Sequence, residues 1–210
     1  MANKLHWLRK LDPNLVIAVG VLISSFAALY IYVRQTSIMN EQTMILLEQT
    51  KASIWPHVSI ELSTSSSPSG IEELRLSVVN KGTGPAILEQ TRISLNGKYA
   101  QSWKSFYDLL NTPDSIRVFH TNQNINGRVL ASQERLKLIR WWRESEEHNR
   151  REFLDYIWDK ADQIKVEVCY RSIHGDTWQV SRLGFKTDIE QNERTVLEAC
   201  NFEEGQLFLQ

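Results

Sequence analysis

Three polar clusters of the sequence contain the side chains best suited to chemistry, and the chemistry that they suit is binding. The turn at residues 80–86 (NKGTGPA) offers backbone N–H groups of the kind that form an anion nest. The loop at residues 121–128 is rich in amides, which can pair with purine edges. The segment at residues 171–178 supplies a cation, a proton donor and an aromatic stacking face. The predicted ligand-binding residues are Asn80, Lys81, Asn122, Asn124, Asn126, Arg128, Arg171, His174 and Trp178.

Each cluster also has a purely structural interpretation, and catalytic motifs do not help to decide. The alternatives are a structural turn, a solvated loop and a hairpin with a core tryptophan. The sequence contains no GxSxG, HExxH, GxxxxGK[ST] or GxGxxG motif. We therefore predict a protein that is not an enzyme and that uses no cofactor and no metal.

One enzymatic alternative stays open, a membrane-tethered nuclease. Asp114, Glu134 and Lys137 resemble the acidic residues and lysine of metal-dependent nucleases. Such nucleases place the second acid and the lysine two residues apart on one strand, so that both face the metal. Glu134 and Lys137 are three residues apart, which favours a chance placement.

Charge and cysteine content restrict the partners and the compartment. The chain has 24 basic and 25 acidic residues. The first 33 residues contain three of the basic residues and one of the acids. Residues 34–210 therefore have 21 basic and 24 acidic residues, a net charge of −3. No broad basic surface is implied, so we predict no binding to duplex nucleic acid. Cys169 and Cys200 are far apart and belong to no CxxC pair, and we expect both to be reduced and buried.

An uncharged run at residues 15–33 predicts a membrane anchor. Its nineteen residues would form a helix about 29 Å long at ~1.5 Å per residue, which matches the hydrocarbon core of a bilayer. Asp12 is the expected N-cap and Pro13 the first helical residue. Two alternatives remain: a signal peptide cleaved near Ser25 and Ala27, and a buried core helix.

Flanking charges and a following helical segment complete the membrane part. Three cations precede the run, whereas only Arg34 and Lys51 follow closely, which favours a cytoplasmic N-terminus and an external domain. Residues 34–53 lack Gly and Pro and should continue the helix as a stalk. From the end of the uncharged run through this stalk, apolar residues recur at every seventh position, which predicts either a parallel bundle of several copies or a helix resting on its own domain. These positions are Ile31, Ile38, Ile45 and Ala52.

The rest of the chain, residues 54–210, has the pattern of a soluble β domain. Alternating apolar residues predict strands near residues 58–62, 74–78 and 164–170, and Asn96-Gly97 predicts a type I′ hairpin. Helices are expected at residues 103–110, 144–160 and 189–199. The predicted fold is therefore an N-terminal tail at residues 1–14, a transmembrane helix, a stalk, and a mainly β, sandwich-like α+β domain with inserted helices.

Two segments resemble a broad bacterial family of membrane-anchored β domains. They are the NxGxGPA turn within residues 78–88 (VVNKGTGPAIL) and the YxSxxGDxW hairpin within residues 168–180 (VCYRSIHGDTWQV). The arrangement of helix, stalk and soluble domain is similar to a membrane effector of type III CRISPR antiviral defence. That resemblance implies an inner-membrane protein with a cytoplasmic, tetrameric domain that binds cyclic tetra-adenylate and perturbs the bilayer. The rival hypothesis is an externally facing scaffold for other envelope proteins.

Overall fold

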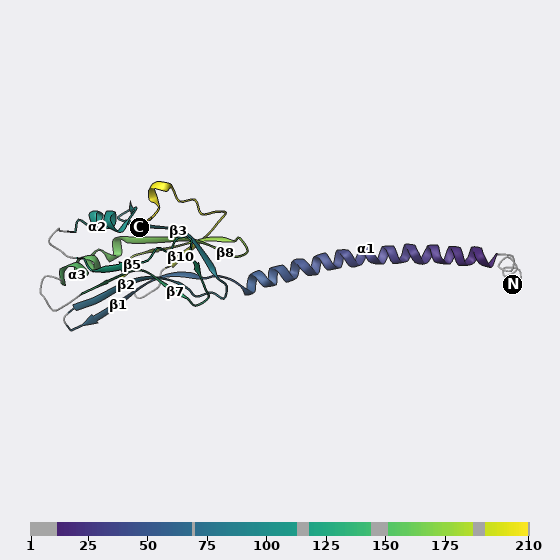
Figure 1. The fold of residues 1–210 in the computed structure, drawn as a ribbon, viewed down its shortest axis with the longest axis horizontal. Coiled ribbons are helices and arrows are strands. Elements are labelled where there is room, and N and C mark those ends of the chain that lie inside the picture. Colours follow the sequence, from purple (N-terminus) through teal and green to yellow (C-terminus); the bar gives the residue numbers. More distant parts are fainter. Residues whose placement is uncertain (1–11, 69, 113–117, 144–150, 187–191, 210) are drawn as a thin grey trace. The chain divides into compact units, whose positions relative to one another are not determined.

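The computed structural model describes residues 12–68, 70–112, 118–143, 151–186 and 192–209 (Figure 1). The chain forms two compact units, with the division between Thr50 and Lys51. The first unit is helical and the second is built mainly from strands.

Helix α1 (Pro13–Ser53) is one uninterrupted helix of 41 residues. It begins as predicted: the Asp12 carboxylate accepts a hydrogen bond from the N–H of Asn14 at 3.0 Å, and Pro13 is the first helical residue. None of its side chains is buried, which excludes a core helix. It is the one helix in the described part of the chain that is long and apolar enough to cross a membrane, which agrees with the predicted anchor and with the signal-peptide alternative alike.

The second unit contains two antiparallel sheets. Sheet A has the strand order β1-β2-β7-β5, and sheet B has the order β10-β9-β8-β3-β4, with β6 pairing with β3. The strands of sheet A are β1 (Val58–Ser67), β2 (Gly70–Asn80), β5 (His120–Asn122) and β7 (Arg135–Trp142). Those of sheet B are β3 (Ala86–Leu95), β4 (Lys98–Ala100), β6 (Val129–Leu130), β8 (Ile164–Ser172), β9 (Thr177–Leu183) and β10 (Asn192–Leu197).

One apolar core joins the facing sides of the sheets and two helices, α2 (Trp103–Leu110) and α3 (Arg151–Asp159). The inward residues of β2 alternate as Leu74, Leu76 and Val78, since successive strand side chains point to opposite faces. Two short 3₁₀ helices, η3 (Ala161–Gln163) and η4 (Glu204–Gln206), complete the elements. The predicted fold class, an apolar N-terminal helix with a mainly β domain, is confirmed.

Local signals in the sequence account for several of these elements. Asn96 and Gly97 have φ angles of 50° and 79°, which is the positive-φ pair that a type I′ hairpin requires. Helix α2 begins at a capping box between Ser102 and Ser105 and has the predicted bounds. Of the helix predicted at residues 144–160, α3 is the second half, and residues 144–150 lie outside the described residues.

The C-terminal region departs from the prediction. The helix expected at residues 189–199 is wrong, because residues 192–197 form strand β10, which pairs antiparallel with β9. The β-branched side chains of Thr195 and Val196 suit a strand, and pairing with a long neighbour outweighs local helix propensity. Asn192 also links the two sheets, because its side chain accepts from the Ile60 N–H at 3.0 Å and donates to the Ser59 hydroxyl at 3.0 Å.

A buried ion-pair cluster lies in sheet B. The Glu167 side chain is 1% exposed, and its oxygens lie 2.6 Å from Arg92 Nε and 2.9 Å from Lys165 Nζ. Gln179 donates a further hydrogen bond to Glu167 at 2.9 Å. Burial alone would raise the pKa of Glu167, but Arg92 and Lys165 outweigh it and hold this pKa below its ordinary value of 4.5.

We predict that Glu167→Gln lowers the free energy of unfolding by about 3 kcal/mol at pH 7, since removing one partner leaves two cations unpaired. A carboxyl with a lowered folded-state pKa stabilises the fold above its unfolded-state pKa, and this stabilisation is lost as the pH falls through the folded-state value. The wild type should therefore lose stability below about pH 4.5, and the variant should lose less over that range. Urea unfolding followed by tryptophan fluorescence at a series of pH values measures both effects. If the free energy of unfolding fell equally steeply with pH in the wild type and the variant, the prediction would be contradicted.

Candidate functional site

The turn at residues 80–86 holds the segment that leads into the first strand. Asn80 is buried at the end of β2, and its side-chain oxygen accepts hydrogen bonds from the N–H groups of His57 and Gly82, both at 3.0 Å. Its amide nitrogen donates to the Gly84 carbonyl at 2.7 Å and to the carbonyls of Leu130 and Ala131 at 3.2 Å. One side chain thus joins three separate segments of the chain.

The backbone of the same turn completes the connection. The N–H groups of Lys81 and Thr83 donate to the carbonyls of His57 and Trp55 at 2.7 and 3.0 Å. The Thr83 hydroxyl donates to the Ser53 carbonyl at 2.7 Å. We call residues 53–57 and 80–84 together the clamp. It fixes the point at which the chain enters the β domain.

The predicted anion nest is therefore wrong. The N–H groups of Lys81, Gly82, Thr83 and Gly84 all donate to protein oxygens, so they are not free for an anion. The Lys81 ammonium lies 2.8 Å from a Glu61 carboxylate oxygen, on sheet A. Of the two interpretations of this turn, the structural one fits.

The amide-rich loop is only partly free to bind. Ile125 is buried beneath it, and the Asn126 amide donates to the Phe208 carbonyl at 3.0 Å. The Asn124 side chain accepts from the Asn126 N–H at 2.9 Å, an arrangement that orders the loop. Asn122 and Arg128 are exposed. The loop therefore offers fewer free polar side chains to a ligand than its sequence predicts.

The hairpin between β8 and β9 holds two of its predicted ligand residues in structural roles. Trp178 is 8% exposed and stacks on Tyr170 with ring centroids 5.6 Å apart, so its ring is part of the core and offers no open stacking face. Arg171 makes an ion pair with Glu89. The backbone N–H of His174 donates to the Ser172 hydroxyl at 3.1 Å.

A disulfide joins the two cysteines, which corrects the expectation that both are reduced. Cys169 lies on β8 and Cys200 follows β10, with Cα atoms 5.8 Å apart. The spacing of 31 residues carries no local signal, because only the folded sheet brings the two positions together. The disulfide ties residues 198–209, here called the C-terminal strap, to sheet B.

The strap is also held by packing. Phe202 lies against the Arg92 guanidinium at 4.1 Å from the ring centroid. Phe208 is 1% exposed and packs on Trp103 with ring centroids 4.8 Å apart. The backbone N–H of Phe208 donates to the Thr91 carbonyl at 2.9 Å. The strap is thus an integral part of the β domain.

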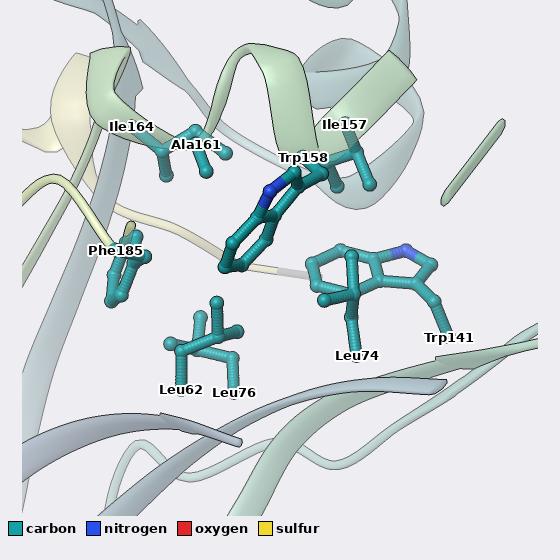
Figure 2. A pocket seen from close by; sticks show the side chains of 9 residues that line it. All are labelled: Leu62, Leu74, Leu76, Trp141, Ile157, Trp158, Ala161, Ile164 and Phe185. Atoms are coloured by element: carbon teal, nitrogen blue, oxygen red, sulfur yellow. The ribbon is translucent and has the colours of Figure 1, made fainter. Parts of the chain in front are cut away.

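An apolar cavity lies between the inner face of sheet A and helix α3. Figure 2 shows the Trp158 ring between Phe185 and Trp141, with leucines of β1 and β2 below it. The cavity volume is about 20 Å³, which is enough for one small group and far less than a ligand pocket needs. The lining residues are Leu62, Leu74, Leu76, Trp141, Ile157, Trp158, Ala161, Ile164 and Phe185.

A larger groove of about 370 Å³ opens between α2, β4 and the strap. Its lining is partly polar, contains the carboxylate of Asp108 and includes no cation. A nucleotide with several phosphates requires cations, so this groove does not suit cyclic tetra-adenylate. The lining residues are Tyr99, Gln101, Ser105, Asp108, Leu109 and Gly205, none of which belongs to the predicted ligand set.

The structure describes two of the three residues of the nuclease alternative, Glu134 and Lys137. Glu134 accepts from the Ala131 N–H at 2.7 Å in a turn, whereas Lys137 lies on β7, and Asp114 lies outside the described residues. Over the described ranges, no group of three or more His, Cys, Asp or Glu side chains could hold a metal ion.

No protein-family model, curated protein or solved structure matches this chain. The class that the fold and the site define is therefore a structural one: a single apolar helix followed by a disulfide-bonded, two-sheet β domain. The resemblance carried by residues 78–88 and 168–180 stays a prediction.

Proposed function

We propose that this protein is a single-pass membrane protein whose β domain lies outside the cytoplasm and binds another component of the cell envelope, without catalysis. The observation that carries the proposal is the disulfide between Cys169 and Cys200. Disulfides form and persist in oxidising compartments and are rare in the cytoplasm, where thiols are kept reduced. The charges that flank the anchor agree, since three cations precede it and two follow closely.

The rigidity of the domain supports a binding role. The clamp, the strap and the disulfide fix the chain at its entrance, at its end and across sheet B. A pre-organised surface binds with a smaller loss of conformational entropy than a flexible one. Such a domain is suited to hold a partner near the membrane.

A second candidate is the effector gated by cyclic tetra-adenylate. It is favoured by the continuity of α1 through the predicted stalk and by the exposure of Ile31, Ile38 and Ile45, at 53%, 53% and 48%. An exposed heptad row can form the seam of a parallel bundle, including the predicted tetramer. This candidate requires a cytoplasmic domain, in which the disulfide would be reduced.

A pair of reporter fusions after Gln210 distinguishes the two candidates. Alkaline phosphatase folds to its active form outside the cytoplasm, and green fluorescent protein becomes fluorescent inside it. We expect phosphatase activity without fluorescence, because the domain contains a disulfide and the anchor is preceded by the larger positive charge. Fluorescence without phosphatase activity would overturn the proposal and favour the second candidate, which calorimetry with cyclic tetra-adenylate would then test on the full chain in detergent.

A further inference from the structure

The outer face of sheet A carries a concentration of cations. Residues of β2 and β7 that point away from the core lie opposite one another, with Arg75 opposite Arg140 and Ser77 opposite Lys137. Arg135 is the next outward residue of β7. Lys81 follows directly after β2. We call Arg75, Lys81, Arg135, Lys137 and Arg140 the basic face.

Over the described ranges, two carboxylates, those of Glu61 and Glu73, form ion pairs with cations of this face. Glu61 lies 2.8 Å from Lys81 and 2.5 Å from Arg135. Glu73 pairs with Arg75 and lies 2.7 Å from Arg140.

Each of these two carboxylates therefore forms ion pairs with two cations. Lys137 is exposed and makes no ion pair with any described residue. The described part of the basic face therefore carries a surplus of positive charge, although residues 34–210 have a net charge of −3.

The crowding of cations on this face lowers the stability of the domain unless a bound group neutralises them. Like charges directly opposite each other on neighbouring strands are destabilising, and Arg75 and Arg140 are such a pair, with the one carboxylate of Glu73 shared between them. The Nε atoms of both arginines are buried and have no hydrogen-bond partner in the part of the chain that the structure describes. The arginine side chains are 34% and 39% exposed, so an acceptor on a partner could contact their exposed guanidinium nitrogens and neutralise the surplus.

The spacing of the cations selects the kind of partner. Arg135 and Lys137 are two residues apart on β7, which places same-face side chains roughly 7 Å apart. Arg140 follows after a bulge, so the three cations of β7 form a row along one strand, and Arg75 lies beside this row on β2. An extended peptide with acidic residues at alternate positions has the same repeat, whereas a lipid surface would call for a plane of cations.

We propose that the basic face binds an extended acidic segment of a partner protein, with carboxylates at alternate positions. This inference rests on the proposed function as a binding domain, and it names the chemistry of the partner. It does not depend on the side of the membrane, so the reporter fusions and the binding test can fail separately.

The test uses the full chain in nanodiscs of uncharged phosphatidylcholine and a fluorescein-labelled peptide of alternating Glu and Ser. Fluorescence anisotropy should show binding that weakens as salt is added. Lys137→Glu should weaken binding about fivefold, since it reverses one charge in the row and breaks no ion pair of the described structure. The matched control is Lys98→Glu, which makes the same charge change at the exposed Asn96-Gly97 hairpin and should leave the affinity within about twofold.

Four results would overturn the inference, and the last two concern the identity of the ligand. The first is no binding of the alternating peptide at low salt. The second is an equal loss in Lys98→Glu and Lys137→Glu, which would mean that net charge alone decides. The third is equal or tighter binding of a peptide with the same composition in two blocks, and the fourth is binding to phosphatidylglycerol vesicles in place of the peptide. Tryptophan fluorescence of each variant verifies that the domain stays folded.

Discussion

Gly82→Ala is expected to lower the free energy of unfolding of the β domain by about 3 kcal/mol or more. A Cβ at this position would lie 2.2 Å from the Trp55 carbonyl oxygen and 2.4 Å from the His57 nitrogen. Both are backbone atoms held by the clamp, so neither can move away alone. The substitution must displace the segment that leads into β1. Urea unfolding followed by tryptophan fluorescence reports on the domain, which contains six of the seven tryptophans.

Gly205→Ala is the matched control for this prediction. A Cβ at Gly205 has no heavy atom within 4 Å, so its effect should stay within about 0.5 kcal/mol. Asn80→Ala tests the clamp from its polar side, since it removes the acceptor of two backbone N–H groups. The Asn80→Ala substitution should lower the free energy of unfolding by about 3 kcal/mol, because buried donors are left unpaired.

A Gly82→Ala variant as stable as the Gly205→Ala control would show that the clamp is not needed for folding.

The clamp also shows how far the sequence can be interpreted. Two glycines, a proline and an asparagine at residues 80–86 do predict a turn. They do not reveal that the missing Cβ of Gly82 leaves room for a backbone segment about 25 residues earlier. That requirement arises from tertiary contact, so no local pattern encodes it. The same turn residues could equally have surrounded an anion.

Elements with a strong local period were predictable. The alternation in β8 and in the second half of β2, the Asn96-Gly97 hairpin and helix α2 follow from patterns of two or 3.6 residues and from capping. Strand β10 has no such period, and its pairing with β9 decides its structure. The expected ligand set failed in part for a related reason: Asn80 and Trp178 are polar or aromatic residues used by the core.

The basic face could not be predicted from the composition, because the net charge averages over all residues of the domain. A net charge of −3 for residues 34–210 implies no basic surface, yet alternate residues of β7 include Arg135 and Lys137. The strand period places such residues on one face, and the pairing of β7 with β2 adds Arg75 to them. The cross-strand pairing is the part that the sequence alone does not supply.

Replacing both cysteines by alanine is expected to lower the free energy of unfolding by about 3 to 4 kcal/mol, because a loop of about 31 residues is no longer closed in the unfolded chain. The loss should first appear in the C-terminal strap, which would keep Phe208 but lose its covalent link to β8. Limited proteolysis should then cut residues 198–209 faster in the double variant than in the wild type.

Reduction provides the control for this prediction. The wild type in dithiothreitol should lose about as much stability as the Cys169→Ala/Cys200→Ala variant, and the variant should not respond to the reductant. Blocking free thiols in intact cells before lysis, followed by unfolding and thiol titration, tests the native state directly. No free thiol is expected, and two thiols per chain would contradict both the disulfide and the proposed external position of the domain. Since the same bond carries the structural prediction and the assignment of the compartment, this titration tests both in one measurement.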